Sequence, residues 1–276
     1  MNTDFTLTAY RELLLSIIQS GYSFYTFEEW CKGQAMGRYV ILRHDVDSKA
    51  GNSLTIAGIE AEMGIQATYY FRIVRGSNQP ETIRAIAGLG HEIGYHYEDL
   101  SLCHGDPVKA FEHFNLQLAY FRKFYPVCTI CMHGSPASKW DNRDLWKNKN
   151  YKDLGIIGEP YLDFLNLPDS TYFTDTARMW DGEKYNIRDK QQVIPVPCSV
   201  INEPVLHKPG KNESVEKRIH STFDLIEWFA EKPVQNIIMI TTHPQRWTDN
   251  VAVRFLDKWK QDIKNQIKKG LIRIKG

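Results

Sequence analysis

The sequence has no apolar run long enough to cross a membrane and no excess of charge of either sign. A helix that spans a bilayer needs about 20 consecutive apolar residues, and no stretch of the 276 residues approaches that length. The 34 basic side chains are interspersed with 33 acidic ones, for a formal net charge of +1. Neither nucleic acid nor an anionic membrane surface is therefore expected as a partner.

Cysteine is scarce, and its spacing is irregular. The chain has five cysteines, an odd number, which favours a reducing compartment over a framework of disulfides. Cys128 and Cys131 have the spacing of half a zinc ribbon or of a redox pair, but no second pair exists, so buried thiols are the favoured interpretation. Asp4 and Arg11 interrupt the apolar residues near the N-terminus, unlike a signal peptide. We expect a cytoplasmic protein.

Internal repeats, low-complexity segments and long Pro/Gly/Ser linkers are also lacking, and helical and strand patterns alternate instead. The predicted helices cover 7–20, 26–32, 50–63, 81–89, 107–124, 214–230 and 251–268. The predicted strands cover 39–42, 66–73, 91–96, 127–132, 154–158, 171–174, 193–200, 236–243 and 271–275. This alternation predicts a parallel α/β sheet or barrel in one domain, 1–276, in which the irregular segment 140–202 supplies substrate-facing loops.

Two acidic residues stand at the end of the first long strand. The apolar run that ends at Leu42 is followed by Arg43-His44-Asp45-Val46-Asp47. Side chains alternate along a strand, so Asp45 and Asp47 point the same way and His44 points to the other face. A turn would explain one aspartate, but two carboxylates this close repel each other unless a proton or a cation lies between them. The pair therefore suggests a metal ligand beside a base.

Reactive side chains recur at the same end of later strands. His96 ends the third long strand, His133 the fourth, Asp175 follows the strand 171–174, and His243 ends the strand before the last helix. Each has an ordinary alternative on its own: a packed core histidine, a turn residue, or an aspartate that pairs with Arg178. The carboxyl ends of parallel strands in a barrel share one rim, so the whole set is better explained as one functional site.

These motifs resemble the polysaccharide deacetylases of the NodB-homology type, carbohydrate esterase family 4. The resemblance extends from Val40 to His243 and includes Gly90-His-Glu-Ile-Gly94-Tyr-His96, the most specific motif. The remaining motifs are Arg43-His-Asp45-Val-Asp47, Asp175 with Trp180, and Ile238-Met-Ile-Thr-Thr-His243-Pro. Together with His133-Gly-Ser-Pro and His243-Pro-x-x-Trp247, they look like the divergent WbmS-like branch.

The resemblance implies a distorted (β/α) barrel of about seven or eight mostly parallel strands, with a divalent metal that is usually zinc. Carried onto this chain, Asp45 would be the general base, and Asp47 and His96 would be metal ligands. His243 would be the general acid, tuned by Asp175. The implied reaction is removal of an N-acetyl or N-formyl group from a sugar, in the biosynthesis of surface polysaccharide or O-antigen.

The sequence departs from the family at the third ligand. The family has a second histidine four residues after the first, but position 100 is Leu. A catalytic zinc needs about three protein ligands, and three residues are candidates: His133 first, then Glu98, then His104. A set rich in oxygen would accept manganese or iron as readily as zinc, and nickel or cobalt are further options.

Several residues are expected to contact the substrate. Tyr95, Tyr97, Trp180 and Trp247 are candidates for stacking against sugar rings, Glu98 could contact the substrate, and Arg178 could help to orient the base. Two rival functions remain open. One is a barrel with a degraded site that binds a glycan or a pathway enzyme, and the other is a metal hydrolase that acts on a different small amide.

Overall fold

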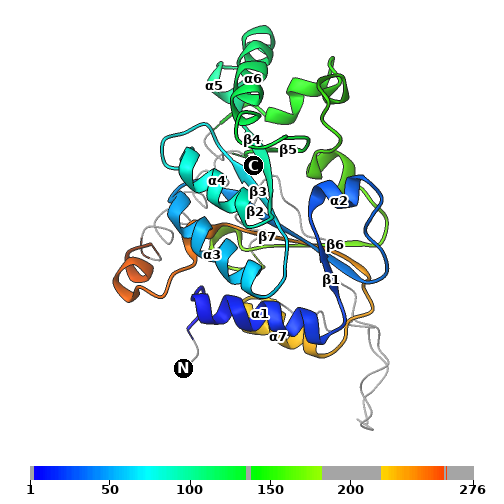
Figure 1. Cartoon of the computed structure of the whole chain (residues 1–276), viewed down its shortest axis with the longest axis vertical. Coiled ribbons are helices and arrows are strands. Elements are labelled where there is room, and N and C mark those ends of the chain that lie inside the picture. Colours follow the sequence, from blue (N-terminus) through cyan, green and yellow to red (C-terminus); the bar gives the residue numbers. More distant parts are fainter. Residues whose placement is uncertain (1–2, 135–137, 182–218, 258, 260–276) are drawn as a thin grey trace, which may run out of the picture.

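The computed structural model describes residues 3–134, 138–181, 219–257 and 259, and its centre is a parallel sheet. Seven strands form this sheet, in the order β5-β4-β3-β2-β7-β6, and β1 pairs with the first part of β2. The strands are β1 (Ser23–Tyr25), β2 (Tyr39–Val46), β3 (Thr68–Phe71), β4 (Glu92–Tyr97), β5 (Ile130–Met132), β6 (Ser170–Thr174) and β7 (Ile237–Thr242). The sheet curls into a half-barrel that is not closed between β5 and β6 (Figure 1).

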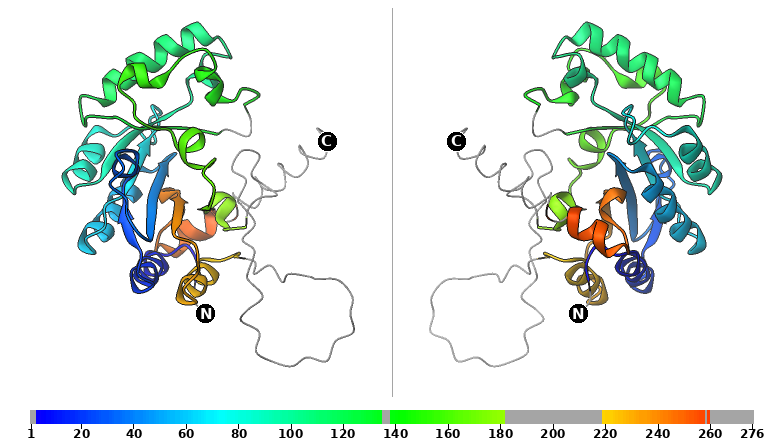
Figure 2. Two further views of the ribbon diagram at one scale, coloured as in Figure 1. Left: turned by 90° about the vertical axis from the view of Figure 1, so that its right-hand side faces the viewer. Right: turned by 90° about the vertical axis from the view of Figure 1, so that its left-hand side faces the viewer.

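Helices cover the convex face of the sheet. Figures 1 and 2 show α1, α3, α4 and α6 along the outside of the curl, with α7 beside α1. The helices are α1 (Leu7–Gln19), α2 (Phe27–Cys31), α3 (Ala50–Glu62), α4 (Pro80–Gly88), α5 (Asp99–Leu102), α6 (Pro107–Phe121) and α7 (Thr222–Ala230). In the part of the chain that the structure describes, no helix is both long and apolar enough to cross a bilayer.

Local sequence signals explain where several helices begin. Thr6 caps α1 by accepting a hydrogen bond from the amide of Ala9, and Thr26 forms a capping box with Glu29 at the start of α2. Asp106 caps α6 in the same way, directly before a proline in the first turn, where the missing amide costs no hydrogen bond. These helices therefore begin where the sequence predicts.

The middle of the chain differs most from expectation. The expected strand 154–158 is instead the end of a short 3-10 helix, η2 (Tyr151–Leu154), followed by a single bridge between Gly158 and Thr129. Residue Gly155 adopts a left-handed conformation, which ends the helical turn. The segment 140–181 also contains η1 (Asn142–Trp146), a π-helical turn η3 (Pro160–Phe164), β6 and η4 (Thr176–Arg178). Irregular structure is thus confirmed for this part of 140–202.

Other predicted boundaries change as well. Helix α7 begins at Thr222, where Ser221 caps it, and residues 214–218 of the predicted helix lie outside the described residues. The short elements β1 and α5 have no counterpart in the prediction. Residues 251–257 are helical, as expected. The predicted strands 193–200 and 271–275, and most of the predicted helix beyond 257, lie outside the described residues.

The two faces of the sheet carry different side chains. His44 points to the convex face, where its Nε2 lies 2.7 Å from Glu60 of α3. Asp45 points to the concave face, as predicted, and its register partner on β3 is Tyr70. Tyr70 pairs in turn with Gly94 of β4, where a Cβ atom would lie 2.3 Å from the Tyr70 ring. Glycine therefore leaves room for this ring, which fills the half-barrel and donates a hydrogen bond to Thr129.

Candidate metal centre

Three side chains converge at the carboxyl ends of β2, β4 and β5. Asp47 directly follows β2, His96 lies near the end of β4, and His133 directly follows β5. Asp47 Oδ1 is 3.7 Å from His96 Nε2 and 3.3 Å from His133 Nε2. Their three donor atoms lie within 4.8 Å of one another. The structure therefore brings Asp47 and His96 close together, and of the three candidates for a third ligand it places His133 beside them.

The hydrogen bond of His96 determines which of its nitrogens faces this group. His96 Nδ1 lies 2.9 Å from the backbone carbonyl oxygen of Cys131, which can only accept, so Nδ1 carries the proton. The lone pair is then on Nε2, the nitrogen near the carboxylates. Burial lowers the pKa of His96 to about 4, although Asp45 and Asp47 oppose the shift. His96 therefore presents a neutral donor nitrogen, as a metal ligand must.

The donor set fits a divalent cation. Asp47 Oδ1 is buried and accepts no hydrogen bond of normal geometry. Its charge is balanced by the surrounding histidines, chiefly His133, and a divalent cation bound to the same atoms would supply that positive charge instead. Ligands that bind zinc tetrahedrally at about 2.0–2.1 Å are separated by roughly 3.4 Å, close to the 3.3 and 3.7 Å found here. Two imidazoles and one carboxylate suit zinc and also accept iron, cobalt, nickel or manganese.

Glu98 supports His133 from behind. Its Oε2 lies 3.1 Å from His133 Nδ1, and Arg72 binds both of its carboxylate oxygens. Burial raises the pKa of Glu98, but His133 and Arg72 lower it by a larger amount, so that the net pKa is about 2. Burial lowers the pKa of His133, whereas Asp47 and Glu98 raise it to about 9. A carboxylate behind an imidazole of this kind orients it and increases its basicity.

The remaining positions near the expected ligand behave differently. Glu98 forms an ion pair with Arg72 and does not lie with the donor atoms of Asp47 and His96. Its place in the structure is behind His133, not that of a ligand or a substrate contact. His104 packs its ring against Trp140, at a centroid distance of 6.1 Å, and belongs to neither donor group found among the described residues. Leu100 is buried in α5. Of the three candidates for the third ligand, His133 is the one whose donor atom lies with those of Asp47 and His96.

Asp45 is held by the arginine two residues before it. Arg43 Nε and Nη2 donate to the two carboxylate oxygens of Asp45 at 2.8 and 2.7 Å, and both side chains are buried. Burial raises the pKa of Asp45, but Arg43 and His96 lower it below the usual range. The suggestion that Arg178 orients this aspartate is wrong: its guanidinium lies 5.1 Å from the centre of the Phe5 ring. Arg43 was visible in the motif, and its two-residue spacing from Asp45 was the signal.

On the opposite side of Asp47, His243 and Asp175 form a buried pair. His243 Nδ1 is 2.6 Å from Asp175 Oδ1, and His243 Nε2 is 3.8 Å from Asp47 Oδ2. Arg246 Nη1 also lies 3.1 Å from His243 Nδ1. The shorter contact with a carboxylate, which can only accept, places the proton on Nδ1. Nε2 of His243 therefore faces Asp47 and is available for proton transfer.

Asp175 accepts further hydrogen bonds that keep it ionised. Its carboxylate accepts from Arg246 Nη1 at 2.7 Å and from Trp247 Nε1 at 2.9 Å. Burial raises the pKa of Asp175, but Arg246 and His243 lower it below the usual value. Arg246, not Arg178, is thus the cation that pairs with Asp175, and sequence reasoning did not single it out.

The aromatic residues expected to stack against a sugar are buried. Tyr95 and Tyr97 point away from His96, to the convex face, where both pack against Phe114 of α6. Trp180 and Trp247 are 0% and 1% exposed. The expectation is therefore wrong for the conformation described, because strand alternation sends the two tyrosines into the helix layer.

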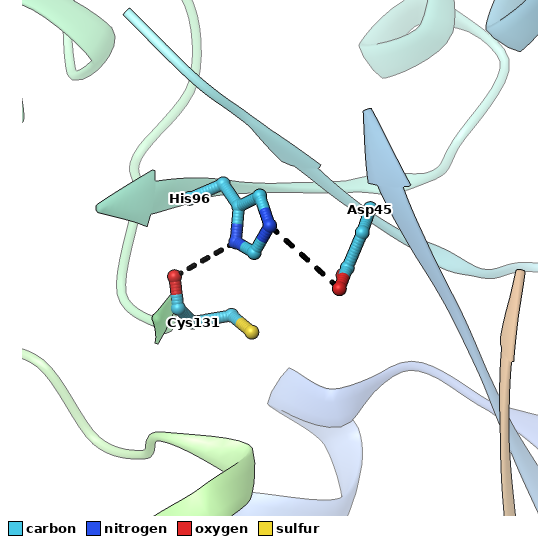
Figure 3. Close-up of side chains that lie close together, drawn as sticks. All are labelled: Asp45, His96 and Cys131. Carbon is cyan, nitrogen blue, oxygen red and sulfur yellow. Dashed lines mark hydrogen bonds and ion pairs between the residues drawn. The ribbon is translucent and has the colours of Figure 1, made fainter. Parts of the chain in front are cut away.

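Cys131 is a site residue that the sequence analysis treated only as a buried thiol. It is the register partner of His96 on β5, so the two side chains share one face of the sheet. Figure 3 shows the Cys131 thiol near the His96 ring, and the ring points toward Asp45. Asp45, His96 and Cys131 form a second, fully buried donor group that shares His96 with the first. The burial predicted for Cys131 is thus found, but its position beside His96 follows from the pairing of β4 with β5 and not from its spacing to Cys128.

The chain matches no protein-family model and no curated protein. The geometry of the rim therefore carries the functional argument.

Proposed function

We propose that this protein is a metal-dependent amide hydrolase with a NodB-type barrel, and that it removes an N-acetyl or N-formyl group from a sugar. The observation that supports it best is the position of His243. Its Nε2 lies 3.8 Å from Asp47 Oδ2, while His96 and His133 approach the other oxygen of the same carboxylate. A proton-transfer group thus stands beside a set of cation ligands, as metal-assisted hydrolysis requires.

Asp47, His96 and His133 would hold the cation. When bound, a divalent cation polarises an amide carbonyl and lowers the pKa of its water to about 7. Asp45 accepts the proton of the attacking water. Because Arg43 keeps the pKa of Asp45 low, Asp45 is ionised at neutral pH and its carboxylate is free of a proton before the reaction.

His243 donates a proton to the departing amine from Nε2. Asp175 fixes the ring by accepting from both the backbone amide and Nδ1 of His243, at 3.0 and 2.6 Å. An ionised carboxylate at Nδ1 also stabilises the imidazolium before it gives up its proton. The sugar and its acyl group are proposed from the motifs, and a different small amide, such as a nucleotide-linked sugar, remains the competing substrate.

The first experiment measures metal content and acyl release together. The purified chain is loaded with zinc or manganese and incubated with N-acetylated amino sugars, as oligomers and as nucleotide-linked monomers, while acetate is quantified. We expect one bound metal per chain and acetate release, and Asp47→Ala should lose both. Asp144→Ala, which removes a carboxylate exposed on η1, is the matched control and should keep both.

Two results would overturn the proposal. A wild-type chain that acquires neither metal would favour the degraded barrel. Acetate release that persists in Asp47→Ala would exclude the proposed ligand set.

A further inference from the structure

Asp45, His96 and Cys131 form a fully buried donor group, and the proposed hydrolysis uses only His96 of these three as a ligand. We propose that this inner group is a second cation position, selective for thiophilic ions such as cadmium, and that an ion bound there excludes one at the outer position of Asp47, His96 and His133.

The strands place the three side chains with little freedom. His96 and Cys131 are register partners on the paired strands β4 and β5, so their positions on the concave face depend on backbone hydrogen bonds and not on a loop. Asp45 belongs to β2 and is fixed by the two hydrogen bonds from Arg43. All three residues are buried, with exposures of 4% for Asp45, 2% for His96 and 0% for Cys131. A preorganised, dry group of this kind needs little rearrangement to bind an ion.

The chemistry of the two groups differs in softness. The outer group offers one carboxylate and two imidazoles, which accept zinc and harder ions alike. The inner group replaces one imidazole by a thiolate, a soft ligand that favours zinc and cadmium over manganese or magnesium. Arg43 uses one lone pair on each oxygen of Asp45, which leaves each oxygen a further lone pair for a cation. Binding releases the thiol proton to solvent as the thiolate bonds to the ion.

Only one ion can be held at a time. His96 Nδ1 donates to the Cys131 carbonyl, so Nε2 is its sole donor nitrogen, and both groups need it. His96 Nε2 lies 3.7 Å from Asp45 Oδ2 and 3.7 Å from Asp47 Oδ1, midway between the two positions. An ion in the inner group would also occupy Asp45. If the proposed function holds, a thiophilic ion is therefore an inhibitor, because Asp45 cannot act as the general base while it binds that ion.

The test is spectroscopic and uses the whole chain with the metal alone. Cadmium is titrated into the wild type, Cys131→Ser and Cys128→Ser, and ultraviolet thiolate-to-cadmium charge transfer and the cadmium-113 NMR shift are recorded. We expect a sulfur-ligated signal in the wild type and in Cys128→Ser. In Cys131→Ser that signal should be absent and cadmium affinity should fall by a factor of at least about ten. Cys131→Ala replaces the serine variant if circular dichroism shows that the latter is unfolded.

A second pair of variants separates the two positions. His133→Gln should keep the cadmium–sulfur signal while manganese affinity falls, and His96→Gln should lose both. Cadmium should inhibit acetate release by the wild type and not by Cys131→Ser.

Metal binding without a sulfur signal in the wild type would overturn the inner position and leave the proposed function intact. A signal that persists in Cys131→Ser would overturn it as well. A chain that binds no metal at all would overturn both proposals.

Discussion

Arg43 binds both carboxylate oxygens of Asp45 from the same strand, two residues away, at 2.8 and 2.7 Å. Each side chain is buried, so the pair is a charged contact within the concave face of the half-barrel. Arg43 also lies against the Tyr161 ring, 4.9 Å from its centroid. The base proposed for hydrolysis is therefore oriented by its own strand and not by a mobile loop.

Substitutions of the two aspartates of β2 should separate chemistry from metal binding. Asp45→Asn should keep the metal and lose turnover, because the amide cannot accept the proton of water, whereas Asp47→Ala should lose the metal. Asp45→Asn also leaves the buried charge of Arg43 without a carboxylate, so we expect a loss of stability of about 3–5 kcal/mol. Metal content and acetate release are measured per folded chain, with folding followed by circular dichroism. Equal metal content and equal activity in the two variants would refute the assignment.

Glu98→Gln should weaken metal binding by about 10–100-fold. The substitution removes the negative charge 3.1 Å from His133 Nδ1, so His133 becomes a poorer ligand. Isothermal titration with zinc measures the effect. Glu62→Gln, which changes an exposed glutamate paired with Arg11, is the control and should leave the affinity unchanged. An unchanged affinity in Glu98→Gln would mean that His133 does not bind the ion.

Asp175→Asn should lower the rate of hydrolysis by about 10²–10⁴-fold while the bound metal is retained. The Asp175 carboxylate holds the His243 proton on Nδ1, and its negative charge stabilises the imidazolium. Asparagine supplies no such charge, so the ring is less well oriented and the imidazolium is less stable. Acetate release and metal content per folded chain are measured together, so that a loss of turnover is separated from a loss of metal. Turnover like that of the wild type would show that Asp175 has only a structural role.

Glu92 should make the protein less stable as the pH rises. Burial raises its pKa from 4.5 to about 7, against hydrogen bonds from Thr129 and Thr68 that lower it. The folded state therefore binds this proton more tightly than the unfolded state. The contribution to stability is complete below about pH 4.5 and is lost as the pH rises through about 7.

Glutamine does not titrate, so the folding equilibrium of Glu92→Gln no longer depends on protonation at this position. Its stability relative to the wild type should increase between pH 5 and pH 8, by an amount on the order of 3 kcal/mol. Urea unfolding of both chains at the two pH values measures it. Parallel stability profiles would contradict the raised pKa.

Gly94→Ala should destabilise the fold by about 1–3 kcal/mol. The added Cβ would lie 2.3 Å from the Tyr70 ring, which must shift from its place beneath the rim. Gly88→Ala, in α4, meets no atom within 4 Å and should be neutral or stabilise by up to about 1 kcal/mol. Thermal unfolding of the two variants compares them directly, and equal melting temperatures would show that the Tyr70 ring has room to move.

Strand periodicity was sufficient for one part of the site. It predicted that Asp45 and Asp47 point to one face and His44 to the other, because alternation is a property of the backbone over a few residues. It also predicted that His96, His133, Asp175 and His243 end on one rim. By contrast, position 100 is leucine and not the expected histidine, so the sequence left three candidates for the third ligand. Only the order and curl of the strands show which of them lies beside Asp47 and His96.

The amino-acid sequence by itself determined the parallel α/β architecture, the paired aspartates and the set of histidines at strand ends, since each follows from local patterns. The tertiary structure alone decided that His133 joins Asp47 and His96, that Glu98 supports it, and that Cys131 lies beside the same imidazole. It also placed the expected sugar-stacking aromatics in the core. The physical reason is that ligation, ion pairing and burial depend on which strands become neighbours, and that choice is made by the packing of the whole sheet.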